Sequence, residues 1–422
     1  MIGPFGKFHA DPAAPACLDD MAARTAPGLH VDILGGKGAA LGLLSHGAGG
    51  AGTLADPSGE LAVVVAGHIY NGRALCPALE HDAPEPAQVV AALYRADRLD
   101  DLAQANGQFC AALVDRTRHR LVLVTDRLAT FPIHVWQDGA GVAFASGLYV
   151  LLGDARVGRR ARLDTLAQLF TMQRTIGTDT PIAGVEALPA ATIATFDREG
   201  RRDRHYWQLR WNARRMAAAE CAEALQGAMR AAVARAQGAG ADGLLLSGGL
   251  DSRWLLAARQ GPMHCWTTAS YADNPELAIA RQIAKMAASP HHACLVDPAS
   301  TLRCLEDAIR DNSGLYPAST PFAAFMPDVG RQSRAIISGH GVDYTLRGYY
   351  LPAQFLRFGG TATRLPALRP IPQRPTGRDV LNNLRQGPPL STLRRIVAPS
   401  WRERWWDGLA TTLHATLEPW LA

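Results

Sequence analysis

The first half of the chain shows short apolar runs, rich in β-branched residues and separated by polar turns. This pattern is typical of β-strands. The runs predict strands at residues 61–66, 109–114, 121–125, 133–136, 142–145 and 191–196. Short strands with turn signals between them indicate packed antiparallel sheets. The Gly- and Ala-rich stretch 47–52 predicts a flexible loop.

The pattern changes after Trp207 to helices that alternate with strands. An Ala-rich segment predicts a helix over 216–237. Further strands are predicted at 243–246, 264–268, 293–296 and 335–337, and further helices from about residue 253, over 275–288 and over 301–310. This alternation indicates a parallel α/β sheet. We therefore expect two domains, residues 1–209 and 210–422, which suits a chain of 422 residues.

The composition excludes several classes of protein. No run of 18 or more apolar residues occurs, which argues against a membrane span. The N-terminus lacks the basic start and apolar stretch of a secretory signal, so we expect a cytoplasmic protein. The seven cysteines are scattered without C-x-x-C spacing. They predict neither a disulfide framework nor a zinc site, and are interpreted as core residues.

Almost every cation in the chain is an arginine, because the only lysines are Lys7, Lys37 and Lys285. Arginine suits bidentate binding of phosphates and carboxylates, but a GC-rich genome would produce the same bias without selection for chemistry. The net charge is +5, and the basic excess lies after residue 344. No aromatic-and-basic motif accompanies it, so no nucleic-acid partner is expected.

A glycine-rich turn joins the predicted strand 243–246 to the helix after it, and consists of Ser247, Gly248, Gly249, Leu250, Asp251 and Ser252. Parallel sheets bind ligands at the carboxyl ends of their strands. The glycines let backbone N–H groups face an anion, and the helix adds its N-terminal partial charge. The serines offer hydroxyl donors, and Asp251 suits Mg²⁺ bound to phosphate oxygens. The alternative is an ordinary tight turn with a serine N-cap.

A second glycine-rich turn follows the predicted strand 335–337, and consists of Ser338, Gly339, His340, Gly341, Val342 and Asp343. Its glycines permit close backbone approach, and Asp343 is a second oxygen ligand for magnesium. Alone this run is typical of many loops. Paired with the first turn in one parallel sheet, it predicts a phosphate and magnesium site.

Both turns resemble the synthetase domain of the asparagine synthetase superfamily, which carries S-G-G-x-D-S and a later S-G-x-G-x-D. An acid followed by spaced alanines on a helix is matched by Glu276, Ala280 and Ala284. Residues 67–71 (G-H-I-Y-N) and 126–128 (D-R-L) resemble the family's glutamine amidotransferase domain. The resemblance implies an α/β two-domain protein. Its N-terminal part is an antiparallel β-sandwich of the Ntn amidotransferase type, and its C-terminal part is a parallel α/β domain of the adenine-nucleotide α-hydrolase (PP-loop) type.

The amidotransferase half departs from the family at the positions that carry its chemistry. The family's nucleophile is a cysteine directly after the initiator Met, and this chain has Ile2. The oxyanion-holding Asn-Gly pair is Ala66-Gly67 here, and the glutamine-gripping loop is not recognisable in 46–52. We therefore expect an inactive glutamine amidotransferase-like domain, without glutaminase activity.

Members with this loss include β-lactam synthetases and lasso-peptide macrolactam synthetases, which use an amine of the substrate itself. At the position of His340, asparagine synthetases place Glu and β-lactam synthetases place Tyr. Histidine titrates near neutral pH and suits proton removal from an attacking amine, although a residue that only lines the loop is an equal alternative. The family's pyrophosphate-contacting lysine has no counterpart, because no lysine follows Lys285.

The resemblance implies that ATP and Mg²⁺ bind at the C-terminal sheet. Leu245, Ser338 and Gly339 would lie near adenine, with Ser247, Gly248, Gly249 and Ser252 on the pyrophosphate and Asp251 and Asp343 on the metal. The chain would adenylate a carboxylate and close a macrolactam with the substrate's own amine, as a lasso-peptide cyclase. The expected partners are a precursor peptide and a leader peptidase or leader-binding protein.

Three alternatives stay open: a β-lactam-type synthetase, an ammonia-dependent asparagine synthetase-like enzyme, and a non-catalytic nucleotide-binding partner of a peptide-maturation complex. The Arg- and Trp-rich C-terminal tail favours a lasso-peptide cyclase over these alternatives. The substrate, its ring size, the acceptor residue (Asp or Glu) and the oligomeric state do not follow from the sequence.

Overall fold

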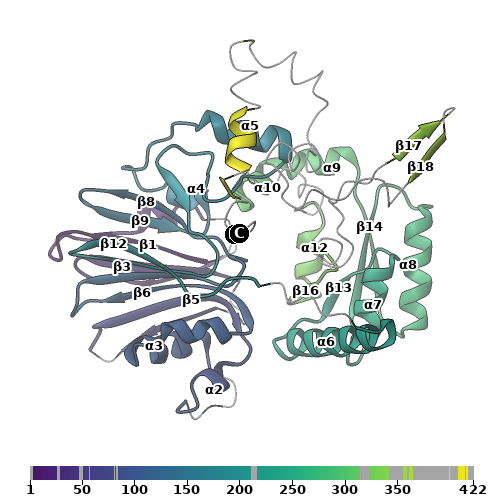
Figure 1. Cartoon of the computed structure of the whole chain (residues 1–422), viewed down its shortest axis with the longest axis horizontal. Helices are drawn as coiled ribbons and strands as arrows, with labels where there is room; N and C mark the ends of the chain where they lie inside the picture. The colour runs from purple at the N-terminus through teal and green to yellow at the C-terminus, as the bar shows by residue number, and fades with distance from the viewer. Residues whose placement is uncertain are drawn as a thin grey trace. The chain divides into compact units, whose positions relative to one another are not determined.

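The computed structural model describes most of the chain (Figure 1). The described residues are 3–25, 29–46, 51–56, 58–79, 81, 84–210, 216–313, 315, 323–341, 355–358, 361–364, 399, 407–413 and 415–416. The chain divides into two compact units. One unit comprises Met1–Arg159, Gly184–Gly314 and Ala318–Gly339, and the other comprises Arg160–Ala183, Leu315–Pro317 and His340–Ala422. The predicted domain boundary near residue 210 stays a prediction.

The N-terminal part contains two six-stranded sheets, and every strand pair in them is antiparallel. The first sheet has the order β10-β8-β9-β1-β3-β2. Its strands are β1 (Gly3–His9), β2 (His30–Leu34), β3 (Ala39–Ser45), β8 (His134–Asp138), β9 (Gly141–Ala145) and β10 (Val185–Ala187). The second sheet has the order β12-β11-β7-β6-β5-β4. Its strands are β4 (Ala51–Ala55), β5 (Leu61–Ile69), β6 (Gly107–Asp115), β7 (Arg120–Thr125), β11 (Thr192–Asp197) and β12 (Gly200–His205).

The two sheets share one hydrophobic core, which confirms the predicted antiparallel layers. Val64 of β5 joins Leu41 and Phe144 of the first sheet in one buried cluster. Val63 and Val65 face the opposite side and pack with helix α3 (Pro86–Arg95). Successive strand residues point to opposite faces, so β5 is buried on both sides, and this explains its unbroken apolar run.

Several of the sequence predictions for this part were incomplete. Ala51 and Gly52, expected in a flexible loop, lie in β4, where they pair with Ala66 and Val65 of β5. The rest of that loop lies outside the described residues. Among its described residues this part also has four further helical segments: α1 (Asp19–Ala22), α2 (Gly72–Leu75), the 3-10 helix η1 (Leu99–Gln104) and α4 (Leu148–Leu151).

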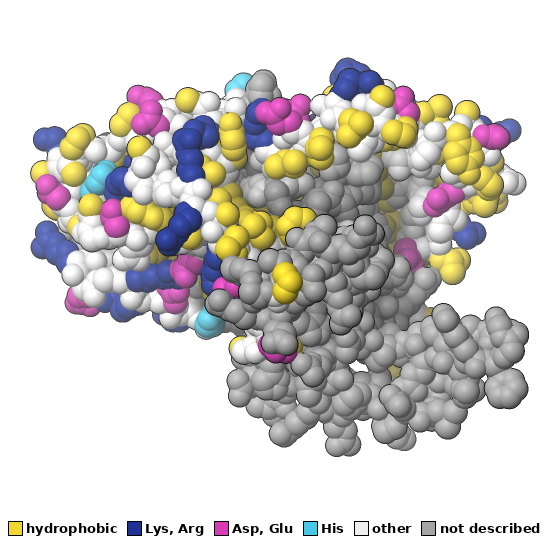
Figure 2. Space-filling model, turned by 90° about the horizontal axis from the view of Figure 1, so that it is seen from above, with side chains coloured by type: hydrophobic (Ala, Val, Ile, Leu, Met, Phe, Trp, Pro, Cys, Tyr) yellow, Lys and Arg dark blue, Asp and Glu magenta, His cyan; other side chains and the backbone are white. Residues whose placement is uncertain are grey.

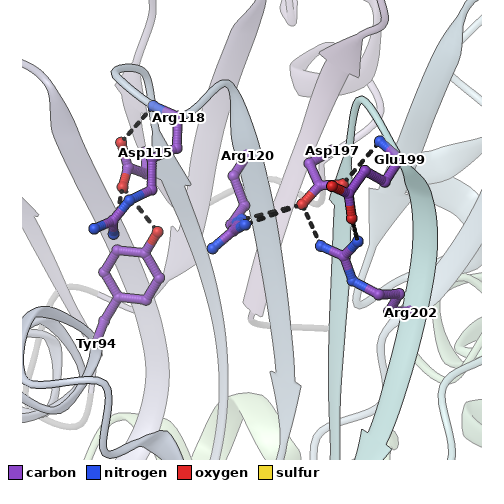
Figure 3. A network of polar contacts seen from close by, with 7 residues as sticks. All are labelled: Tyr94, Asp115, Arg118, Arg120, Asp197, Glu199 and Arg202. Atoms are coloured by element: carbon purple, nitrogen blue, oxygen red, sulfur yellow. Dashed lines mark hydrogen bonds and ion pairs between the residues drawn. The ribbon is translucent and has the colours of Figure 1, made fainter.

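A network of polar contacts joins β7, β11 and β12 at one end of the second sheet (Figure 3). The Asp197 carboxylate accepts hydrogen bonds from Arg120 and Arg202, and the backbone N–H of Glu199 donates to it at 3.0 Å. Burial raises the pKa of Asp197, but the backbone N–H of Glu199, together with Arg202 and Arg120, outweighs it and lowers the pKa below 3.8. The charged carboxylate is therefore the form that stabilises the fold.

Replacement of Asp197 by Asn should lower the free energy of unfolding by about 2 kcal/mol at neutral pH, the scale of hydrogen bonds to a charged group. The folded-state pKa is lowered, so this contribution is complete above 3.8 and disappears as the pH falls through the lowered value. Denaturant unfolding at several pH values measures it. Asp100→Asn, which removes an exposed pair with Arg204, should change stability by less than about 1 kcal/mol. A loss in Asp197→Asn that is the same at every pH would contradict the assignment.

The C-terminal part contains a four-stranded parallel sheet of order β15-β14-β13-β16, as predicted. Its strands are β13 (Gly243–Leu245), β14 (His264–Ala269), β15 (His291–Leu295) and β16 (Ile336–Ile337). Helices α6 (Ala218–Gly238), α7 (Leu250–Ala258) and α8 (Pro275–Met286) contribute to a buried cluster with β13 and β14. This alternation of strands and helices gives each strand of the sheet the same direction.

The start signals of the later helices are visible in the sequence. Asn274 caps α8 by accepting the N–H of Glu276 at 2.8 Å, and Pro275 occupies the first turn. The single helix predicted over 301–310 was wrong. Asp297 caps α9 (Pro298–Arg303), the helix ends at Cys304, and α10 (Leu305–Asp311) begins there. A short helix, α12 (Met326–Gly330), precedes β16.

The second unit contains α5 (Leu163–Met172), a helix over 407–413, and the antiparallel pair β17 (Phe355–Phe358) and β18 (Thr361–Arg364). Ala167, Met172 and Ile176 pack with Leu409 and Leu413. In the part of the chain that the structure describes, no helix has the length and apolar character that a membrane crossing needs. On the face drawn in Figure 2, basic and acidic side chains are interspersed among the described residues.

Candidate functional site

The first glycine-rich turn joins β13 to α7, as the sequence predicted. Gly248 adopts a left-handed backbone, with φ of +76°. A Cβ atom there would lie 3.0 Å from Cγ2 of Ile279 and 3.4 Å from the carbonyl oxygen of Glu276, at the start of α8. Gly249 is the N-cap of α7 and, like Ser247, is exposed. The turn therefore needs glycine for its shape, and it presents the N-terminus of α7 to solvent.

The two serines of the turn hold it together. The hydroxyl oxygens of Ser247 and Ser252 lie 3.2 Å apart, and the N–H of Ser247 donates to the Ser252 hydroxyl at 3.3 Å. The Ser252 hydroxyl bonds to the Gly249 carbonyl, and the N–H of Gly249 donates to the Ser247 hydroxyl, both at 3.2 Å. Ser252 is buried, whereas Ser247 is exposed. The structure thus gives Ser252 a part in shaping the turn and leaves Ser247 accessible to a ligand.

The first two residues of the second turn lie near the first turn. Strand β16 pairs in parallel with β13, and Ser338 and Gly339 follow it directly. A Cβ atom on Gly339 would lie 3.3 Å from Cβ of Asp251, and 3.7 Å from Cδ1 of Leu255. Residues that are far apart in the sequence are therefore close in space. A side chain at position 339 would press on the side chain of Asp251, which would have to shift slightly.

The proposed metal ligands are described in part. Asp251 is half-buried in the first turn of α7. Asp343 lies outside the described residues, and His340, the residue after Gly339, belongs to the second unit. Among the described residues, no group of three or more His, Cys, Asp or Glu side chains has the geometry of a metal site. A magnesium ion held by Asp251 and Asp343 with phosphate oxygens stays a prediction.

A polar pair lies directly behind the first turn, and the sequence analysis did not identify it. The Thr267 hydroxyl of β14 donates to the Leu246 carbonyl at 2.6 Å, so it fixes the last residue before the turn. Nε2 of His291 lies 3.0 Å from the same hydroxyl and donates to it, because the only hydroxyl hydrogen is already used. Burial first, then the charges of Arg281 and His292, lower the pKa of His291. These residues position the turn.

The remaining predicted positions lie in the sheet or on α8. Leu245 is in β13 and pairs with Trp266, so its backbone is at the carboxyl end of the strand, as its predicted adenine contact requires. Ala280 and Ala284 are fully buried in the core, and Glu276 is exposed. The acid-and-alanine pattern of α8 is therefore explained by packing, with small residues where the helix meets the sheet.

The amidotransferase-like motifs serve structural contacts. Ala66 is fully buried, and Gly67 has φ of +95°, with space for no Cβ because the Gln108 carbonyl oxygen would lie at 2.0 Å. Asn71 fastens the segment before β6, accepting the N–H of Asn106 at 2.7 Å. The Asp126 carboxylate accepts the N–H groups of Phe109 and Leu128 at 3.0 and 2.8 Å. Ile2 lies outside the described residues.

Comparison with known families gives two matches. Residues 39–207 match the glutamine amidotransferase domain, and residues 224–415 match asparagine synthase. Comparison with curated proteins gives no match.

Two solved structures are similar to this chain at low identity. One is a glutamine phosphoribosylpyrophosphate amidotransferase from B. subtilis in complex with ADP and GMP, 12% identical, covering 65% of this chain and 57% of its own length, with a TM-score of 0.29. The other is described as the allosteric regulatory enzyme of purine biosynthesis, 11% identical, covering 62% of this chain and 67% of its own length, also with a TM-score of 0.29. The chain thus spans about three fifths of the first of these proteins.

Proposed function

From the two domain matches, which together support the asparagine synthetase superfamily, we propose that this chain is an ATP-dependent, AMP-forming amide ligase that closes a ring within a peptide. The observation that carries the proposal is the close approach of Gly339 to Asp251. It brings the start of the second glycine-rich turn to the first turn, at the carboxyl ends of adjacent parallel strands, where such sheets bind ligands.

The geometry of the described residues fits a nucleotide. Gly248 and Gly249 carry no side chain that would block the start of α7, Ser247 adds an exposed hydroxyl, and the partial positive charge of the helix favours an anion. These three residues would hold the pyrophosphate of ATP, and Ser252 would support them from behind. Leu245, Ser338 and Gly339 would contact the adenosine. Asp251 and Asp343 would bind Mg²⁺, which neutralises phosphate charge when bound.

The reaction that we propose has two transfers. An oxygen of the substrate carboxylate attacks the α-phosphorus of ATP, the bond to the bridging oxygen breaks, and pyrophosphate leaves. The amine of the same substrate then attacks the acyl carbon, AMP leaves with the oxygen, and the amine gives up a proton. Because both reacting groups belong to one molecule held in place, the second transfer gains the high effective molarity of an intramolecular reaction.

The amine comes from the substrate, because the amidotransferase-like half lacks the groups that release ammonia from glutamine. Position 2 carries no thiol, and Ala66 is a buried methyl group where the family has an oxyanion-holding amide. We propose that this half is a scaffold. A lasso-peptide precursor, with an Asp or Glu side chain as acceptor and a free N-terminus as amine, is the substrate class that fits, and a leader-binding or leader-cleaving protein would deliver it.

The test uses the protein with Mg²⁺-ATP and candidate core peptides, and measures AMP, pyrophosphate and loss of water from the peptide. We expect all three with a peptide that has a free N-terminus and an inner Asp or Glu. N-acetylation should prevent the ring, and exchange of the acceptor for Asn or Gln should also prevent AMP release. ATP binding without AMP release for any peptide would support the non-catalytic alternative, and product from a small amino-acid derivative would support a β-lactam-type synthetase.

His340 provides a finer prediction about the second transfer. If it removes the proton from the attacking amine, His340→Ala should slow ring closure by about 100- to 10,000-fold, the usual contribution of a general base, and change pyrophosphate release much less. Single-turnover measurement of both products separates the two steps. Equal loss of both would exclude the role as base and leave His340 as a residue that lines the loop.

A further inference from the structure

Arg253 lies next to the first turn but outside its sequence pattern, S-G-G-x-D-S. It follows Ser252 directly, in the first turn of α7, and is exposed. Side chains of a helix tilt toward its N-terminus, so the side chain of Arg253 runs back along α7 toward the turn. Its Nε donates to the carbonyl oxygen of Gly249 at 3.3 Å. The guanidinium group therefore lies at the N-terminal end of α7, beside the exposed Gly249.

The contact with Gly249 has two consequences. Its carbonyl oxygen also accepts the N–H of Arg253 at 3.1 Å and the Ser252 hydroxyl at 3.2 Å, so three donors hold this acceptor on the helix side of the turn. The Nε–H uses only one of the five N–H groups of arginine, and the other four stay available on the two terminal nitrogens.

Other arginines of the same domain have different surroundings. Arg259 binds the Leu256 carbonyl at the opposite end of α7, at 2.8 Å. Arg310, Arg331 and Arg334 each pair with a carboxylate. Arg253 has no carboxylate as ion-pair partner among the described residues, and it stands where the helix carries positive partial charge. Without a ligand, a cation at the N-terminus of a helix is unfavourable. It becomes favourable when an anion binds both the Arg253 guanidinium group and the N-terminus of α7.

We propose that Arg253 is the side-chain cation of the pyrophosphate loop, and that it binds the β- and γ-phosphates of ATP and the pyrophosphate that leaves. This inference rests on the proposed function and extends it. The planar group of arginine forms bidentate hydrogen bonds with phosphate oxygens, which a lysine cannot do. A residue within the loop thus supplies a positive charge to a chain in which no lysine follows Lys285.

Binding measurements test the role without requiring turnover. Calorimetry should show that Arg253→Gln weakens Mg²⁺-ATP and magnesium pyrophosphate by about 10- to 100-fold, the worth of a hydrogen bond to a charged group. AMP, which lacks both terminal phosphates, should bind the variant within about twofold of the wild-type protein. The affinity of Arg253→Lys for Mg²⁺-ATP should lie between those of the wild-type protein and Arg253→Gln, because lysine keeps the charge and loses the bidentate geometry.

Arg230→Gln is the matched control, because it removes an exposed arginine from α6 of the same domain and should leave all three affinities unchanged. Retained AMP binding shows that Arg253→Gln is folded. Equal Mg²⁺-ATP affinity in Arg253→Gln and wild type would overturn the inference while the proposed function stands. An equal loss of AMP and ATP would overturn it too, because it indicates a structural role. A wild-type protein that binds no Mg²⁺-ATP would remove the proposed function itself.

Discussion

Asp251→Ala is expected to lower ATP-dependent amide formation by at least about 1000-fold and to leave the fold intact. The reason is that Asp251 would hold the magnesium ion on the phosphates. A metal that neutralises the negative charge of the phosphates contributes several kcal/mol of transition-state stabilisation, and this would be lost. Asp251 is half-buried at the start of α7, in contact with Gly339, so an alanine fits the same space. AMP release and ring closure, measured with the peptide of the functional test, report the effect.

Asp328→Ala is the control for Asp251→Ala. Asp328 is an exposed carboxylate on α12 that pairs with Arg331, and its loss should change the rate by less than about twofold. Near-wild-type turnover in Asp251→Ala would show that this carboxylate is no metal ligand. A loss of turnover accompanied by a large fall in melting temperature would assign Asp251 to the structure of the turn.

Gly248→Ala is expected to weaken Mg²⁺-ATP binding by more than about 10-fold. An alanine would have to adopt φ of +76°, which costs about 1–2 kcal/mol for a residue with a side chain. Its Cβ would also meet Ile279 at 3.0 Å and the Glu276 carbonyl oxygen at 3.4 Å, so α8 or the turn must shift. Both effects move the backbone N–H groups that would face the phosphates. Calorimetric titration with Mg²⁺-ATP measures the change.

Gly227→Ala is the control for Gly248→Ala, because it makes the same substitution at a position with space for the side chain. Gly227 lies within α6, and no atom lies within 4 Å of the position its Cβ would take. Alanine favours a helix over glycine by about 1 kcal/mol, so this variant should be slightly more stable and bind Mg²⁺-ATP normally. Unchanged affinity in Gly248→Ala would mean that the turn does not hold the phosphates.

The sequence predicted several strands that carry a continuous apolar run, but the buried strands β1 and β3 were not among them. Strands β5, β7 and β13 were found because their buried residues are apolar in continuous runs. Strand β12 (Gly200–His205) was missed because it carries charged residues and is almost wholly exposed. Its pairing with β11 and its ion pairs with Asp197 and Glu199 hold it in place, and these partners leave no periodic signal.

The candidate site was predictable where chain geometry alone decides it. Parallel strands end at the same edge of a sheet, so turns that follow β13 and β16 were expected at that edge, and Gly339 does lie near Asp251. The buried role of Ser252 depends on how the turn closes on itself. The contacts of Thr267 and Arg253 depend on side-chain rotamers and on a neighbouring strand, which sequence spacing does not specify.

The central claim is that two carboxylates from separate turns bind one divalent cation beside the glycine-lined turn. Electron paramagnetic resonance of Mn²⁺ added with ATP measures this directly, because Mn²⁺ accepts the same oxygen ligands as Mg²⁺. We predict that the wild-type protein immobilises Mn²⁺ only when ATP is present, and that Asp251→Ala and Asp343→Ala each abolish this signal. If either variant immobilises Mn²⁺ as strongly as the wild-type protein does, the assignment of that carboxylate as a metal ligand is wrong.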